Sequence, residues 1–114
     1  MKLTIGLLVM TTAIFVSAAS AQGKEGAEGK TLFQSHCAMC HGPDGAGSTP
    51  IGKTLHIMDL RSAAVQKNTD AQLTSIVENG KNKMPAFKTK LKPEQVKDLV
   101  AYVRELGKAE AGTK

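Results

Sequence analysis

One short motif constrains this chain more than any other stretch, namely Cys37-Ala38-Met39-Cys40-His41. Two cysteines three positions apart with a histidine directly after them are typical of covalent haem attachment. Residues three apart share one face of a helical turn, so both thiols can add to the two vinyl groups of one haem. His41 then lies next to the iron and can supply an imidazole ligand. We therefore predict one haem c, with its iron, held by Cys37, Cys40 and His41.

Two cysteines at this spacing have other uses, namely a redox-active thiol pair, half of a zinc site or a structural disulfide. A thioredoxin-like site would need a βαβ pattern nearby, which is not visible in the sequence. Zinc would need a second pair of ligands at metal spacing. The chain has only two cysteines, and His36 and His56 do not form such a pair with His41. Haem attachment is the favoured interpretation.

The N-terminal stretch has the features of a secretory signal peptide. A basic start is followed by an apolar run over residues 3–16 and by small residues that end in Ala19-Ser20-Ala21. We predict a cleaved signal peptide over residues 1–21 and a single haem domain over residues 22–114. An uncleaved membrane anchor is the alternative, but the apolar run is short for a span. Export predicts a periplasmic protein.

The composition suits a chain that folds around a cofactor. The chain has 114 residues, with three Phe, one Tyr and no Trp. A small domain with few large apolar side chains buries little surface, so a porphyrin would supply apolar bulk. The formal net charge of +5 falls by one, to +4, when Lys2 leaves with the signal peptide. An exported, mildly basic chain with few aromatic residues indicates acidic protein partners or anionic membrane surfaces rather than nucleic acid.

Apolar spacing predicts an all-α fold with no strands. We expect a helix from about residue 25 to the haem motif, a loop over residues 42–50, a short helix over residues 59–65, and clearer helices after Thr69 and from Pro93. Thr69 and Gln72 fit a capping box, and Gly80 suits a left-handed position at the helix end. Gly107 is expected to end the last helix, followed by a mobile tail.

Met84 is the best candidate for the second axial ligand. It lies in a loop over residues 81–87 between two expected helices, and Pro85 disfavours helix at Met84. Its thioether is soft and polarisable, and Met/His ligation raises the haem potential. Met58 and His56 remain as alternatives. On the other side of the iron, a loop carbonyl, with Pro50 as first candidate, could accept the Nδ1–H of His41 and orient the ring.

Three segments together closely resemble the class I c-type cytochromes. They are the haem motif with Gly42 and Asp44-Gly45, the stretch from Gly80 through Met84-Pro85-Ala86-Phe87, and the stretch from Leu99 to Val103. The resemblance implies the small cytochrome c fold, with helices wrapped around one covalently bound haem and with His41 and Met84 as axial ligands.

The resemblance also implies that the first and last helices cross through Gly29, Phe33, Leu99 and Tyr102. The short distance in sequence from His41 to Met84 is similar to small bacterial and photosynthetic members of the family. A tryptophan that mitochondrial members use near a haem propionate is absent, which leaves Arg61 and Lys53 as candidate contacts.

The predicted function is one-electron transfer by a soluble periplasmic protein that is not an enzyme. Exposed lysines near Met84 would steer a monomer toward acidic patches on redox partners, including membrane redox complexes in transient contact. The alternative is that these lysines only aid solubility. The five are Lys81, Lys83, Lys88, Lys90 and Lys92. Two other functions remain open: a small haem peroxidase with His56 as its acid–base group, and a haem-based sensor with a labile sixth ligand.

Overall fold

The computed structural model describes residues 13–14 and 22–112. This part of the chain contains no strand, only an isolated bridge between Lys81 and Met84. The predicted all-α class is confirmed. The predicted signal peptide, residues 1–21, lies outside the described residues apart from residues 13 and 14. The helices are α1 (Gln22–His36), α2 (Ala38–His41), α3 (Pro50–Thr54), α4 (Ala63–Gln66), α5 (Asp70–Asn79) and α6 (Pro93–Gly112).

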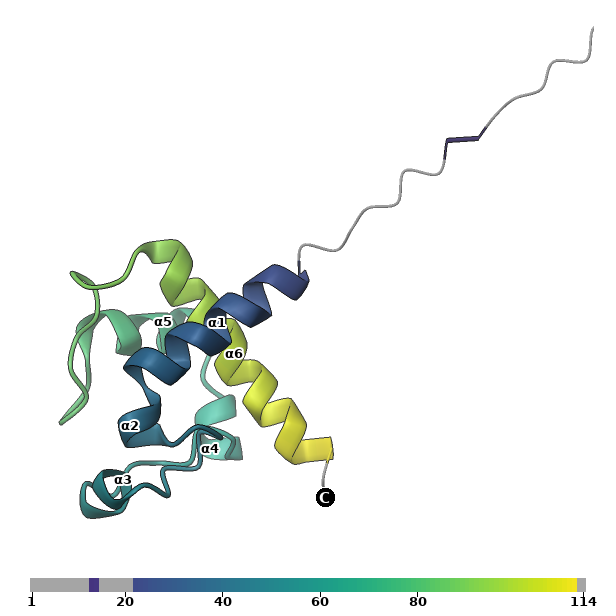
Figure 1. Ribbon diagram of the computed structural model, residues 1–114. Coiled ribbons are helices and arrows are strands. Elements are labelled where there is room, and N and C mark those ends of the chain that lie inside the picture. Colours follow the sequence, from purple (N-terminus) through teal and green to yellow (C-terminus); the bar gives the residue numbers. More distant parts are fainter. Residues whose placement is uncertain (1–12, 15–21, 113–114) are drawn as a thin grey trace, which may run out of the picture.

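Helices α1 and α6 cross and make the most extensive contact between helices (Figure 1). Gly29 lies at the crossing, where a Cβ atom would overlap the carbonyl oxygen of Asp98 and lie 3.1 Å from the Cβ of Tyr102. The rings of Phe33 and Tyr102 pack with their centroids 5.2 Å apart. Phe33 and Leu99 are only 1% and 2% exposed. The expected crossing through these residues is therefore confirmed.

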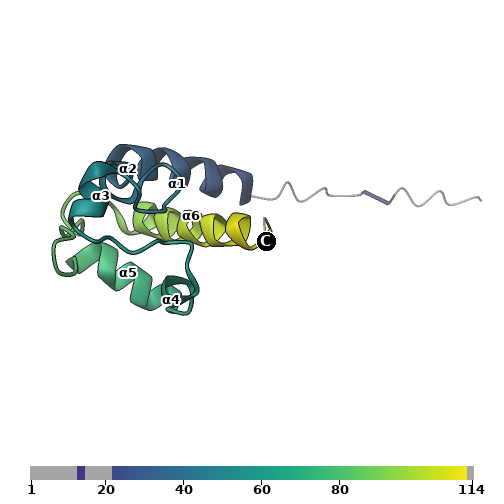
Figure 2. The same cartoon turned by 90° about the horizontal axis from the view of Figure 1, so that it is seen from below.

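The long helix α6 lies between α1 on one side and α5 on the other (Figure 2). One apolar cluster joins α1, α6 and the segment that precedes α6, and a second joins α4, α5 and α6. Leu60 and Val103 pack against both clusters. The core therefore consists of two clusters rather than one. The first contains Phe33, Phe87, Leu91, Val96, Leu99 and Tyr102, and the second Val65, Leu73 and Val100.

Local capping signals placed α5 correctly. The Thr69 side chain accepts a hydrogen bond from the backbone of Gln72, and the Gln72 side chain accepts one from the backbone of Thr69. The capping box is thus complete. Gly80 follows with φ 75° and ψ 171°. Its positive φ agrees with the prediction, but its ψ lies outside the left-handed helical region, so Gly80 turns the chain sharply.

Gly107 does not end the last helix, and the expectation of a mobile tail from Lys108 was wrong, because α6 continues to Gly112. A Cβ at Gly107 would overlap the side-chain amide of Gln66. That amide donates hydrogen bonds to the carbonyls of Leu60 (2.8 Å) and Val103 (3.0 Å). The absence of a side chain at Gly107 therefore allows the Gln66 side chain of α4 to pack closely against α6.

Two short helices also differ from the prediction. Helix α3 was not expected, although Thr49 and Pro50 form a usual helix start of an N-cap followed by proline. The helix expected over residues 59–65 begins only after the Ser62 cap, as α4. No helix in the described ranges is long and apolar enough to cross a membrane.

Candidate functional site

A largely apolar cavity lies between α1, α5 and α6. Its volume is about 70 Å³. Cys37, His41 and Met84 line it together, although they come from separate parts of the chain. These three side chains supply sulfur and imidazole nitrogen to walls that are otherwise apolar. The remaining lining residues are Phe33, Leu60, Leu73, Ile76, Val77, Leu99, Val100 and Val103.

The haem motif continues the first helix into the cavity wall. The amide of Cys37 donates to the carbonyl of Phe33 (2.9 Å), and the amides of Cys40 and His41 both donate to the carbonyl of Cys37 (3.2 and 2.9 Å). This near-helical path keeps the two cysteines within one turn. Both are half-buried free thiols, and Cys37 lines the cavity whereas Cys40 is not among its lining residues. Burial, with a smaller contribution from Cys40, raises the pKa of Cys37 to about 11.

His41 is a half-buried imidazole beside the cavity. Burial lowers its pKa below the ordinary value, which favours the neutral ring that a metal ion requires. Its ring centroid lies 6.5 Å from that of Phe33. Its Nδ1 is buried and has no hydrogen-bond partner among the described residues. An apolar cavity with this neutral imidazole and a thioether in its walls fits a haem.

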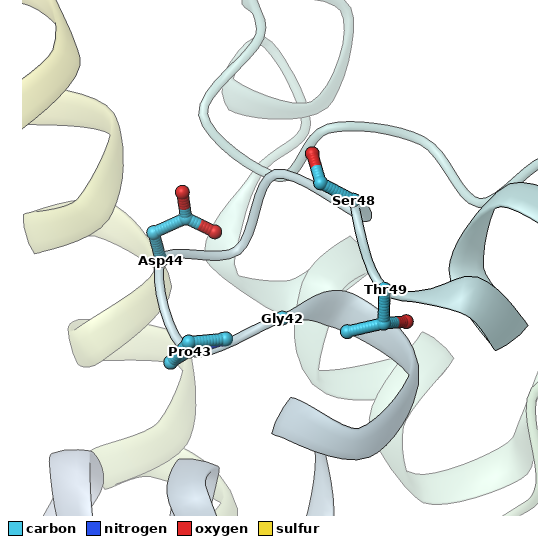
Figure 3. Close-up of a pocket in the computed structure, with 5 residues that line it drawn as sticks. All are labelled: Gly42, Pro43, Asp44, Ser48 and Thr49. Carbon is cyan, nitrogen blue, oxygen red and sulfur yellow. The ribbon is translucent and has the colours of Figure 1, made fainter.

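The loop after α2 fixes the histidine end of the motif. The amide of Gly47 donates to the carbonyl of His41 (2.7 Å), and the hydroxyl of Thr49 donates to the carbonyl of Cys40 (3.1 Å). A shallow, open depression lies on this loop (Figure 3). Its charged residue, Asp44, accepts a hydrogen bond from the amide of Ala46 (3.0 Å). The depression belongs to the support of α2 rather than to the haem cavity.

The loop that carries Met84 folds back on itself. The amide of Met84 donates to the carbonyl of Lys81 (2.9 Å), and the amide of Lys81 donates back to the carbonyl of Met84 (3.2 Å). At Gly80, a Cβ would lie 3.0 Å from the backbone nitrogen of Ala86, so this turn favours glycine. The amide of Phe87 then donates to the carbonyl of Val77 on α5 (3.0 Å). These contacts hold Met84 at the cavity.

The alternative axial ligands lie elsewhere. Met58 is 57% exposed, and it does not line the cavity. His56 is exposed, with a positive φ of 52°, and it is also absent from the lining. Of the candidates weighed from the sequence, Met84 is the one that the fold brings to the same cavity as His41.

One predicted supporting contact was wrong. The carbonyl of Pro50 accepts a hydrogen bond from the hydroxyl of Thr54 (2.9 Å) within α3, not from His41. Arg61 forms ion pairs with Asp59 (2.9 Å) and Glu110 (3.0 Å), and its contact with a propionate stays a prediction. The sequence did not identify Thr49 as a support for the motif, although the threonine–proline pair at a helix start was a usable signal.

An all-α fold around an apolar cavity that contains an attachment motif and a histidine defines a haem protein of the c type. The comparisons agree. A family model described as cytochrome c oxidase, cbb3-type, subunit III matches residues 24–103. A cytochrome c6 of Nostoc sp. is 39% identical over 116 residues, which cover 100% of both chains. A cytochrome c6 of Anabaena variabilis is 46% identical over 88 residues, 73% of this chain and 91% of that relative.

A solved structure is also similar, that of the KustC0563 c-type cytochrome. It has a TM-score of 0.64 and 38% identity, and the match covers 68% of this chain and 95% of that one. The chain belongs to the class I c-type cytochromes. It accordingly binds one covalently attached haem c with its iron. It is an electron carrier and not an enzyme.

Proposed function

We propose that this cytochrome is a periplasmic one-electron carrier whose haem iron is held between His41 and Met84. One observation carries the proposal: Cys37, His41 and Met84 line the same apolar cavity. Haem iron bound there supplies a one-electron couple, and Met/His ligation shifts that couple to higher potential. Cys37 and Cys40 would hold the porphyrin through thioether bonds.

The protein side chains have distinct roles in this proposal. His41 offers a neutral imidazole on one side of the cavity, and burial favours that form. Met84 offers its sulfur from a loop whose backbone is hydrogen-bonded at both ends. The apolar lining would keep water away from the iron. Exclusion of water helps to set the reduction potential of the haem. Six-coordinate iron suits electron transfer rather than substrate binding.

The decisive test compares the absorption spectra of ferric wild-type protein, Met84→Ala and Met58→Ala. A weak far-red sulfur-to-iron band should appear in the wild type and in Met58→Ala and should be lost in Met84→Ala. Met58 is a suitable control because it is exposed and lies outside the cavity. A band that persists in Met84→Ala, or that is lost in Met58→Ala, would contradict the proposed ligation.

Export is tested separately from ligation. The proposal includes a cleaved signal peptide over residues 1–21 and a mature domain over residues 22–114. The intact mass of protein from a periplasmic fraction should equal that of residues 22–114 plus one haem. A mass that retains residues 1–21 would instead indicate an uncleaved anchor.

We also propose that the loop around Met84 is the docking surface for acidic redox partners. Residues 79–93 contain five lysines and no Asp or Glu, and all five lysines are exposed. Helix α6 begins at Pro93, and the helix dipole places a partial positive charge at this N-terminus. This loop lies at the opposite end of α6 from the C-terminus (Figure 2), where Glu110 pairs with Arg61. Positive charge is therefore concentrated beside Met84.

Rates of electron transfer with an anionic inorganic complex test this surface. The rate should fall as ionic strength rises, because salt screens the attraction. Lys83→Gln should lower the low-salt rate and flatten the salt dependence, whereas Lys108→Gln, an exposed lysine near the other end of α6, should leave both unchanged. Equal effects of the two substitutions would contradict the proposed docking surface, because the rate would then depend only on the overall charge of the protein.

A further inference from the structure

The segment that carries Met84 is joined to α5 through its backbone. The amide of Phe87 donates a hydrogen bond to the carbonyl of Val77 (3.0 Å), and the amide of Lys88 donates one to the carbonyl of Glu78 (3.1 Å). Both acceptors lie in α5. Neither bond reaches α1, the helix that leads into the haem motif. A link between the Met84 segment and α1 therefore has to come from side chains.

The ring of Phe87 makes such a link with the last residue of α1. The rings of His36 and Phe87 meet edge to face, with their centroids 6.1 Å apart and their planes at 79°. This distance and angle are those that aromatic pairs favour. Phe87 is only 8% exposed and belongs to the first core cluster, whereas His36 is exposed. An exposed histidine thus packs against a buried ring three residues after Met84.

This contact connects the two segments that carry the proposed iron ligands. His36 directly precedes Cys37, the first residue of the haem motif, and Phe87 follows Met84 in the same segment. The ammonium group of Lys90 also lies 5.6 Å from the centre of the Phe87 ring. Lys90 belongs to the Met84 segment itself, so its contact cannot join that segment to α1. The contact from His36 can do so.

We propose that His36 is a positioning residue that helps to keep Met84 at the iron, through its edge-to-face contact with Phe87. The proposal rests on Met84 as an iron ligand, which is part of the proposed function. Movement of the segment away from the cavity releases Met84 and separates Phe87 from His36. Because the contact exists only in the closed arrangement, it lowers the fraction of protein in which the sixth position is open. The affinity for a competing ligand from solution measures that fraction.

The test is a titration of the ferric holoprotein with imidazole, followed by the loss of the far-red sulfur-to-iron band. An imidazole nitrogen replaces the Met84 sulfur on the iron, with no change in oxidation state. His36→Asn removes the ring and should lower the apparent dissociation constant for imidazole by about two- to fivefold, as expected for the loss of one aromatic contact. His36→Phe retains a ring and should restore the wild-type constant.

His56 provides the matched control, because it is also an exposed histidine but lies outside the cavity lining. Its φ is 52°, a conformation that asparagine also tolerates. His56→Asn should leave the affinity for imidazole unchanged. An equal gain of affinity in both asparagine variants would overturn the proposal. Wild-type affinity in His36→Asn, with or without a lower melting temperature, would do the same, as would a His36→Phe protein that behaves like His36→Asn.

A double-mutant cycle locates the effect at the ring of Phe87. In a Phe87→Leu background, His36→Asn should no longer change the affinity for imidazole, because the partner ring is already absent. The same two- to fivefold change in both backgrounds would show that His36 acts by another route and would refute the proposal.

Failure of this proposal is distinguishable from failure of the proposed function. A ferric wild-type protein without the sulfur-to-iron band, before any imidazole is added, would refute Met84 ligation. An intact band in every His36 variant, together with an unchanged affinity for imidazole, would refute only the role of His36.

Discussion

Substitution of Gly29 by alanine tests the crossing on which the fold depends. Alanine is the better helix former, by about 1 kcal/mol relative to glycine, so helix propensity alone predicts a more stable protein. At Gly29, however, a Cβ would overlap the carbonyl oxygen of Asp98 and lie 2.9 Å from its carbonyl carbon. These are backbone atoms of α6, and they cannot move aside as a flexible side chain can. Packing therefore opposes propensity at this position.

The size of the packing cost decides whether Gly29→Ala lowers or raises the free energy of unfolding. Carbon atoms in contact are best about 3.5–4.0 Å apart, so α1 and α6 would have to separate by roughly 1 Å. Overpacking in a core costs about 1–3 kcal/mol, and this contact lies beside Tyr102, which is only 8% exposed. We expect the upper half of that range. After the gain in propensity is subtracted, Gly29→Ala should lower the free energy of unfolding by about 1–2 kcal/mol.

Gly26 provides the matched control on the same helix. A Cβ there would meet the Oε1 atom of Glu105 at 2.8 Å, which is the end of a flexible side chain that can move away. Gly26→Ala should therefore raise stability by up to about 1 kcal/mol. Thermal unfolding of the holoprotein should show melting temperatures shifted by roughly 4–8 °C per kcal/mol, in opposite directions. A Gly29→Ala protein as stable as Gly26→Ala would refute the reasoning.

Three further predictions concern the core, a cap and the Met84 loop. Leu99→Ala should lower the free energy of unfolding by about 2–5 kcal/mol, because Leu99 is 2% exposed; in denaturant titrations, a loss below that range would show that the site collapses around the smaller side chain. Thr69→Ala should cost about 1 kcal/mol by the same measurement, since it breaks the capping box with Gln72; an unchanged midpoint would mean that packing alone holds α5. Gly80→Ala should cost about 1–3 kcal/mol, because φ 75° with ψ 171° is a conformation that almost only glycine adopts, and it should weaken the far-red band by displacing Met84; an unchanged band would show that the loop tolerates the change.

Features that depend on neighbouring residues could be predicted from the sequence. The Cys37–His41 motif needs one helical turn, and the capping box of Thr69 spans three residues. Gly29 was also informative, because glycine within a helix loses stability unless a close contact uses the missing side chain. The loop position of Met84 followed from Pro85. The family resemblance then gave the overall fold, and the comparisons agree with it.

Other features were hidden because their partners are distant in the sequence. Gly107 looked like a helix end, yet α6 continues through it, and the Gln66 amide occupies the space that a side chain at Gly107 would fill. The ion pair between Arg61 and Glu110 was likewise not visible in the sequence. A local pattern does not reveal such pairings, since they depend on how remote segments pack.

The sequence by itself determined the haem motif, the helical class and the candidates for the iron ligands. The tertiary structure decided which of these candidates share a cavity: Met84 reaches the lining that contains His41, whereas His56 and Met58 do not. It also placed Thr49 against the carbonyl of Cys40. The physical reason is that hydrogen bonding within a turn depends on adjacent residues, whereas a binding cavity depends on the packing of helices that lie far apart in the chain.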